Sequence, residues 1–382
     1  MEKSIGLYIH VPFCKSKCYY CDFNSFSNKS ELVEAYFEAL KKEIIIYGER
    51  AEGYEVKTVF IGGGTPSSVD SRYIEDVVRL CRQHFKIAAD AEISLESNPG
   101  TLSEDKLRAY KYIGINRLSI GLQAWQNRLL KNIGRVHSIE EFVDNYKLAR
   151  EIGFNNINID MIFSLPHQTL EDWAETVNNV ADLGPEHISC YSLKIEENTV
   201  FWEKYEHGEI DEIDDHTDRE MYYLAKRQLA GHGYGMYEIS NFALEGYECK
   251  HNLIYWKAKE YLGLGAGAHS YFNKKRYNNL YNIEDYIKNY MEYEGKYIEG
   301  EAIIDEAESM SEYIILGMRL TCGISQSEFK GRYGIEIMDK FGGKFKKLIG
   351  KGLVEHKAGR LLLTQTGLDY ANQVFMEFID ID

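Results

Sequence analysis

The chain has 382 residues, which is enough for two domains or for one large α/β barrel with an appended domain. Its formal net charge of −16 disfavours a sequence-independent nucleic-acid binder, because phosphate binding needs a basic surface. No apolar run is long enough for a signal peptide or a membrane span. We therefore expect a cytoplasmic protein, in which clustered cysteines are metal or redox ligands instead of disulfides.

Short apolar segments alternate with helical segments in the first half of the chain. All five prolines lie beside these apolar segments, where they mark strand edges. We expect strands at residues 5–11, 58–61, 92–96, 117–120, 156–162 and 187–191. We expect helices between them at residues 31–47, 72–85, 103–113, 139–152 and 170–183. This alternation predicts a parallel sheet, either a partial (β/α)6 barrel or a doubly wound sheet.

Three cysteines lie close together after the first expected strand, at Cys14, Cys18 and Cys21. Thiolate sulfur is the ligand that iron–sulfur clusters use, and three thiolates would leave one iron of a four-iron cluster open for a small ligand. The alternatives are buried structural thiols or part of a zinc site. The close spacing, on a turn with aromatic residues between the cysteines, favours the cluster.

Polar residues follow each expected strand. In barrels the carboxyl ends of the strands carry the chemistry, so these residues are expected to surround one site together with the cysteines. They include His10, Gly63, Gly64, Thr65, Glu96, Gln123, Asp160 and Tyr191.

The pattern changes after residue 191, and the last part of the chain has helical segments at residues 312–320, 326–333 and 338–349. A hairpin turned at Ala358 and Gly359 and a helix from Gln365 follow. This order is typical of a winged helix, which either binds DNA or serves as a structural lid, and the acidic total favours the lid. We divide the chain into a barrel (1–235), a connecting segment (236–305) and a mainly helical, winged-helix-like domain (306–382).

Several motifs occur in order along nearly the whole chain: IHVPFCKSKCYYCDF, FIGGGTPS, LESNPG, RLSIGLQ, GRVH and NIDMIFSLP. Together they resemble the radical S-adenosylmethionine superfamily, in which a [4Fe-4S] cluster binds S-adenosylmethionine and its reduction can generate a deoxyadenosyl radical. Within that superfamily the chain resembles the coproporphyrinogen III oxidase-like branch, and more closely its heme chaperone subgroup.

The resemblance implies specific ligands. Cys14, Cys18 and Cys21 would hold the cluster. The residues implied to contact S-adenosylmethionine, which the related oxidase divides between two molecules, are Tyr8, Tyr20, Gly63, Gly64, Thr65, Glu96, Gln123, Arg135 and Asp160.

Two features of the sequence distinguish the heme chaperone subgroup from the related oxidase. The related oxidase carries a further cysteine two residues after the third, where this chain has Phe23, and a long N-terminal extension, where this chain starts just before the first expected strand. Both differences argue against coproporphyrinogen decarboxylation. The segment HNLIYW, from His251 to Trp256, is similar to the HNxxYW motif assigned to heme binding in the chaperone subgroup. His251 is the implied axial ligand, with Cys249 as a possible second ligand and His269 as a lower-ranked alternative.

We therefore expect a heme chaperone that passes heme to apo-hemoproteins, by resemblance to membrane respiratory proteins. It would be peripheral at the membrane during delivery, bind no nucleic acid and form a homodimer as the subgroup does. The alternatives are an oxygen-independent coproporphyrinogen III oxidase, which is an enzyme, and a cluster-dependent DNA-binding sensor.

Overall fold

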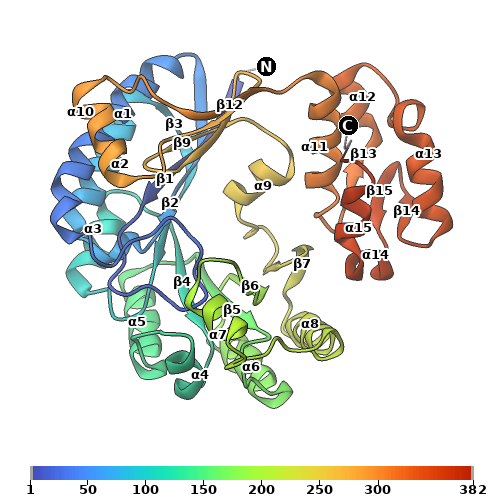
Figure 1. Cartoon of the computed structure of the whole chain (residues 1–382), viewed down its shortest axis with the longest axis horizontal. Coiled ribbons are helices and arrows are strands. Elements are labelled where there is room, and N and C mark those ends of the chain that lie inside the picture. The colour runs from blue at the N-terminus through green and yellow to red at the C-terminus, as the bar shows by residue number, and fades with distance from the viewer. Residues whose placement is uncertain (1–2, 380–382) are drawn as a thin grey trace.

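The computed structural model describes residues 3–379, and within them one mixed sheet of twelve strands is the largest feature (Figure 1). Six parallel strands form its centre in the order of the chain. A doubly wound sheet would reverse this order near its middle, so the sequential order identifies a partial (β/α)6 barrel. All six expected strands are confirmed: β1 (Lys3–Val11), β2 (Tyr54–Gly63), β3 (Lys86–Ser97), β4 (Arg117–Gln123), β5 (Ile157–Phe163) and β6 (His187–Ser192).

Helices follow the parallel strands and cover the outer face of the sheet (Figure 1). Several begin at a side-chain cap, and both Ser138 and Thr169 form capping boxes that hold the first turn of their helices. The expected helices are confirmed, and short ones lie between them. The helices of this region are η1 (Ser30–Leu32), α1 (Val33–Arg50), η2 (Pro66–Ser68), α2 (Ser71–His84), α3 (Glu104–Tyr112), α4 (Asn127–Asn132), α5 (Ile139–Ile152), α6 (Leu170–Leu183), α7 (Val200–Glu206) and α8 (Asp215–Gly231).

Residues after α8 extend the sheet at both edges. Beyond β6 lie β8 (Asn241–Ala243) and then β7 (Gly235–Glu238). Beyond β1 lies β9 (Tyr261–Leu264), which runs parallel to it. Helix α9 (Lys250–Trp256) connects the two edges and packs against β1 and β2. The edge after β9 is completed by β10 (His269–Phe272), β11 (Lys275–Asn278), α10 (Ile283–Glu292) and β12 (Glu299–Ile303).

The last part of the chain packs around a hydrophobic core of its own, which includes Ile314, Phe329, Phe345 and Phe378. Its helices and its three-stranded sheet have the order expected of a winged helix, and the hairpin turns at Ala358 and Gly359 as expected. The elements are α11 (Glu306–Gly317), β13 (Ile324–Ser325), α12 (Gln326–Tyr333), α13 (Ile337–Gly350), β14 (Val354–Lys357), β15 (Arg360–Leu363), α14 (Gln365–Asp369) and α15 (Ala371–Met376).

Polar contacts join this C-terminal part to the edge of the barrel sheet. Arg319 lies 3.4 Å from the fully buried Glu238 carboxylate, and its guanidinium stacks on the ring of Trp256. The Thr321 hydroxyl donates to the carbonyl of Met236 at 3.0 Å. Within residues 3–379, no helix combines the length and hydropathy needed to cross a bilayer.

Candidate functional site

The three cysteines lie on the loop after β1, and their side chains line a cavity of about 370 Å³ at the carboxyl ends of the strands. Backbone hydrogen bonds hold this loop in place. The Cys14 N–H donates to the carbonyl of Phe26 at 2.9 Å, and the Cys21 N–H donates to the carbonyl of Cys18 at 3.2 Å. The loop therefore presents all three thiols, which are free, to one space.

Each of the three sulfurs has a polar group beside it. Burial raises the pKa of the Cys14 and Cys21 thiols, so these groups hold their protons until a metal displaces them. Hydrogen-bond donors and a cation beside the sulfurs favour the thiolate form that a cluster needs. The contacts are Thr65 Oγ1 to Cys14 Sγ (3.5 Å), Arg135 Nη1 to Cys18 Sγ (3.7 Å) and Ser25 Oγ to Cys21 Sγ (3.9 Å).

Among the described residues, no three His, Cys, Asp or Glu side chains converge closely enough to hold a single metal ion. An iron–sulfur cluster does not require such convergence, because each thiolate binds a different iron. The spacing of the thiols around one cavity and the donors beside them fit a [4Fe-4S] cluster. Cys14, Cys18 and Cys21 would hold it.

The glycine turn after β2 lies against the cysteine loop. Gly63 has a φ of 114°, which favours glycine, and a Cβ on Gly64 would lie 2.8 Å from the Phe13 carbonyl and 3.0 Å from Cys14 Sγ. The N–H of Gly64 donates to the carbonyl of Val11 at 2.9 Å. Glycine is therefore needed here for the β2 turn and the cysteine loop to approach each other.

Two carboxylates face the cavity from neighbouring parts of the sheet. Glu96, at the end of β3, accepts a hydrogen bond from the Gly63 N–H at 3.0 Å. Burial, and next the charge of Asp160, raise the pKa of Glu96 to about 7. Asp160, on β5, accepts from the Ser119 hydroxyl at 2.7 Å and from Asn158 Nδ2 at 2.9 Å. The two groups are acceptors suited to hydroxyl or ammonium donors.

Arg135 brings a cation to the same cavity. Its Nη2 donates to the Gly121 carbonyl at 2.6 Å, while its Nε is buried and has no hydrogen-bond partner within residues 3–379. An unpaired buried donor of this kind is costly, and a carboxylate ligand would satisfy it. Gln123 lies nearby at a register shift between β4 and β5, with a φ of 73°. Such backbone strain in a residue other than glycine is concentrated at functional sites.

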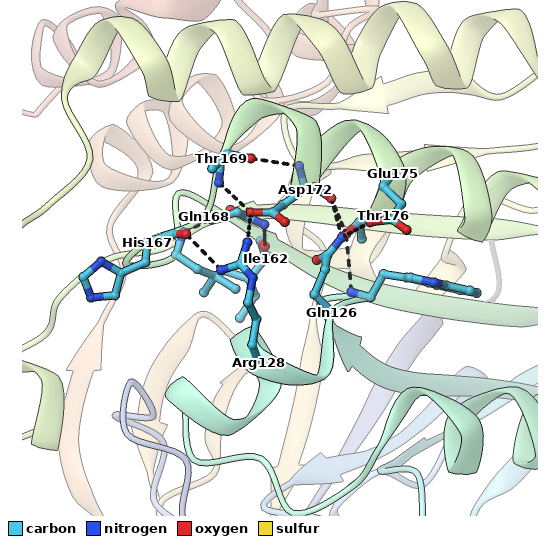
Figure 2. Close-up of polar contacts among 11 residues, drawn as sticks. Gln126, Arg128, Ile162, His167, Gln168, Thr169, Asp172, Glu175 and Thr176 are labelled. Atoms are coloured by element: carbon cyan, nitrogen blue, oxygen red, sulfur yellow. Dashed lines mark hydrogen bonds and ion pairs between the residues drawn. The ribbon is translucent and has the colours of Figure 1, made fainter.

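The turn between β5 and α6 fixes another part of the cavity wall (Figure 2). Thr169 and Asp172 form the capping box of α6, and Arg128 from α4 pairs with the Asp172 carboxylate. The Gln168 side chain donates to the carbonyl of Ile162 at 3.4 Å. Because Ile162 lines the cavity, these contacts hold the end of β5 in position.

The structure brings most of the expected residues together, and three lie elsewhere. Tyr8, His10 and His251 do not line the first cavity. Tyr8 and His251 line a smaller one of about 160 Å³, whose wall also includes Glu96 and Asp160, and His10 borders a further cavity. Residues of the first cavity that were not expected there include Ser119 and Lys194. A serine inside the otherwise apolar segment LSIGL was the available signal for Ser119. The expected residues that do line it are Cys14, Cys18, Tyr20, Cys21, Gly63, Gly64, Thr65, Glu96, Gln123, Arg135, Asp160 and Tyr191.

His251 is 1% exposed, and both of its ring nitrogens are engaged. Nδ1 lies 2.7 Å from the Thr58 hydroxyl and Nε2 lies 2.8 Å from the Tyr255 hydroxyl. Burial, and next the charge of Arg117, lower the pKa of His251 to about 3, so the ring is neutral. Binding to a heme iron would require one of these hydrogen bonds to open. The assignment of His251 as axial ligand stays a prediction.

Comparisons with known proteins agree with this geometry. The family model of the Radical SAM superfamily matches residues 8–180, and that of the HemN C-terminal domain matches residues 304–370. The fold is similar to that of coproporphyrinogen III oxidase (HemN) from Escherichia coli, with a TM-score of 0.85 and 24% identity over 99% of this chain and 90% of that chain. The fold and the superfamily match thus define a radical SAM protein.

Relatives that match this chain over nearly their whole length identify the family within this class of protein. The heme chaperone HemW of Bacillus subtilis (strain 168) is 38% identical over 97% of this chain and 98% of its own length. The heme chaperone HemW of Escherichia coli (strain K12) is 33% identical over 98% of each chain. The chain belongs to the HemW family.

Proposed function

We propose that the protein is a heme chaperone that binds heme and a [4Fe-4S] cluster with S-adenosylmethionine and delivers heme to apo-hemoproteins. The observation that carries this proposal is the similarity to proteins named heme chaperone HemW over nearly the whole chain, which includes the cysteine cavity and the HNLIYW segment. The cavity supports the cofactors, because it combines three thiols with two carboxylates and an arginine that has a free buried donor.

The residues of the cavity have distinct proposed roles. Cys14, Cys18 and Cys21 hold the cluster, which when bound supplies an electron and an open iron for the methionine end of S-adenosylmethionine. Arg135 pairs with the ligand carboxylate, and Glu96 accepts from a hydroxyl or ammonium group. The remaining proposed contacts, by position on the rim or beside it, are Tyr8, Tyr20, Gly63, Gly64, Thr65, Gln123 and Asp160.

We further propose that the heme recipients are membrane respiratory proteins, that the protein meets them as a peripheral protein, and that it forms a homodimer. The acidic total supports the choice of a protein partner over nucleic acid. For the chain itself we propose a barrel, a connecting segment and a C-terminal domain; the second hydrophobic core, formed mainly by residues after 306, supports the last boundary.

Two assays on the anaerobically reconstituted protein test the function. The first measures heme binding by absorbance, and the second measures carbon dioxide released from coproporphyrinogen in the presence of S-adenosylmethionine. We expect heme binding and no release of carbon dioxide. Turnover in the second assay would favour the oxidase and contradict the chaperone proposal, and Phe23, which occupies the position of the further cysteine of the oxidase, is the residue that argues against turnover.

A further inference from the structure

A third cavity, of about 510 Å³, lies next to the cysteine loop, and of the residues given a role in the proposed function only Tyr8, Gly63 and Glu96 border it. Gly63 and Glu96 belong to its wall and to the wall of the cluster cavity, so the two spaces are adjacent. Its volume is within the usual range of small-molecule pockets, about 300–1,000 Å³. The cavity is therefore large enough for an organic ligand that would lie beside the proposed cluster.

The wall of this cavity is rich in aromatic side chains that have exposed faces. Phe23 is 62% exposed and Tyr281 is 47% exposed, although both border the cavity. Tyr255 and Tyr261 form another part of the wall and pack edge to face, with ring centroids 4.6 Å apart. Exposed aromatic surface around a hollow is typical of a binding site for a flat apolar molecule.

Two histidines border this cavity, and only one is available to a ligand. His10 is buried, with Nδ1 3.0 Å from the Tyr8 hydroxyl and Nε2 2.8 Å from the Asn24 carbonyl. His269 is exposed; its Nε2 lies 2.9 Å from the Tyr281 hydroxyl, and its Nδ1 has no hydrogen-bond partner within residues 3–379. Partial burial, and next Arg276, lower the pKa of His269, so its imidazole is neutral at neutral pH.

The three relevant histidines differ in what an iron would have to displace. At His251, which is 1% exposed, a metal bond would break one of its two side-chain hydrogen bonds, to Thr58 or to Tyr255. At His269 an iron could bind Nδ1, which has no hydrogen-bond partner within residues 3–379. If it bound Nε2 instead, the exposed Tyr281 hydroxyl could form a hydrogen bond to water. Binding of iron to His269 therefore costs less free energy than binding to His251.

We propose that this cavity is the heme site and that His269 supplies the axial nitrogen, with the porphyrin against Phe23 and the tyrosines of the wall. The inference rests on the proposed heme chaperone function and names its ligand site. Bond formation uses the imidazole lone pair and replaces a water ligand on ferric heme, so no electron is transferred.

His251 then has a positioning role within the same site. Its Nε2 holds the Tyr255 hydroxyl, and Tyr255 in turn lines the heme cavity. The HNLIYW segment would thus shape the wall of the site without binding the iron. A glutamine at position 251 would keep a donor and an acceptor for Thr58 and Tyr255, whereas alanine would keep neither.

The test uses the full-length, cluster-reconstituted protein, titrated anaerobically with hemin and followed by difference absorbance and electron paramagnetic resonance. His269→Ala should lose the signature of an imidazole-bound iron and bind hemin at least about tenfold more weakly. Free imidazole added to His269→Ala should restore the signature. His251→Gln should keep it, as should His356→Ala, which changes an exposed histidine of β14 in the C-terminal domain.

The outcomes separate the two proposals. Failure of the unsubstituted protein to bind hemin would overturn both the function and the site. Hemin binding with an unchanged signature in His269→Ala, or a signature lost in His251→Gln, would overturn the site alone. Loss in His269→Ala without rescue by imidazole would also overturn the ligand assignment, because an exposed strand residue has no core to disturb.

Discussion

At the scale of single residues, the exposure of each cysteine and the cavity that it lines determine whether its sulfur can bind iron. The chain has seven cysteines, and in the described residues Cys81, Cys190 and Cys249 are buried while Cys322 lies in the C-terminal domain. Burial raises the pKa of Cys81 to about 12, so it stays a thiol. Within residues 3–379, only the three cysteines of the β1 loop combine partial exposure with a shared cavity.

Replacing Cys18 by serine should abolish the cluster. Serine has no soft sulfur ligand, and Arg135 would then lose its partner on the loop. Iron and sulfide analysis after anaerobic reconstitution measures the result, and we expect less than about a tenth of the parent content. Cys322→Ser is the matched control, since Cys322 is exposed and lies outside the cavity. A full cluster in Cys18→Ser would contradict the ligand assignment.

The affinity for S-adenosylmethionine should depend on the charge of Glu96. Because its pKa is about 7, the carboxylate is only partly ionised at neutral pH. A ligand hydroxyl or ammonium group binds better to the ionised form, so binding should tighten as the pH rises through 7 and then level off. Calorimetric titration across this range measures it. Glu96→Gln should flatten the profile, while Glu104→Gln, at an exposed position, should follow the parent.

At the scale of elements, one buried carboxylate ties three parts of the fold together. Glu43 on α1 accepts from the Gly265 N–H after β9 at 2.7 Å, from Asn279 Nδ2 at 2.6 Å, and from the hydroxyls of Tyr286 and Tyr290 on α10 at 2.6 and 2.8 Å. This cluster holds α10 and the turn after β9 against α1. Burial outweighs the four hydrogen bonds and raises the pKa of Glu43 to about 7.

The Glu43 cluster should make stability depend on pH. The pKa in the folded chain lies above the ordinary value of 4.5, so the stabilisation is complete below that value and is lost as the pH rises to about 7. The shift corresponds to at most about 3 kcal/mol. Urea unfolding measures the free energy of unfolding at about pH 5 and at about pH 8, and this free energy should fall more between the two pH values in the parent than in Glu43→Gln. An equal fall in both proteins would mean that Glu43 stays ionised in the folded protein.

Removing the Glu43 side chain should strongly destabilise the fold. Glu43→Ala leaves several buried donors without an acceptor and should lower the free energy of unfolding by about 3 kcal/mol or more. Glu38→Ala, an exposed position on the same helix, breaks only a surface pair with Lys41 and should cost less than about 1 kcal/mol. Urea unfolding of the two variants at one pH compares them directly.

The strands and helices of the barrel could be predicted because their signals are local. Apolar strand bodies, prolines at their edges and helical periodicity all lie within one element. The pairing of β9 with β1 could not be predicted, because β9 is the short segment YLGL and its partner is far away in the sequence. The cysteine spacing indicated the cluster and the end of the third strand indicated Glu96, whereas Arg135 needed the family motifs. The burial of His251 could not be predicted either, because the sequence around a histidine that is next to aromatic residues does not indicate whether the histidine is buried or exposed.

At the scale of the whole molecule, the C-terminal domain meets the barrel sheet through a buried charge. Glu238 on β7 is fully buried, and Arg319 is the cation beside it. The same arginine stacks on Trp256 of the HNLIYW segment at 4.4 Å from its ring centroid. One side chain of the C-terminal domain therefore contacts both the edge of the barrel sheet and the segment that shapes the proposed heme site.

Arg319→Ala should loosen this contact. It leaves the Glu238 carboxylate buried without its cation, which should cost about 2 kcal/mol. We expect faster limited proteolysis between the barrel and the C-terminal domain, and an earlier urea transition. Arg227→Ala, at an exposed position on α8, is the control. Cleavage at the control rate would show that other contacts, such as that of Thr321, hold the domain.

Glu96 and Gly63 lie in the common wall of the S-adenosylmethionine cavity and the proposed heme cavity. Two ligands that meet one titrating carboxylate do not bind independently: the ligand that fixes its charge changes the free energy of the other. Thermodynamic reciprocity then requires that S-adenosylmethionine alter the affinity for heme by the same factor by which heme alters the affinity for S-adenosylmethionine. Loading and release of the cargo would thereby be linked to the state of the cofactor.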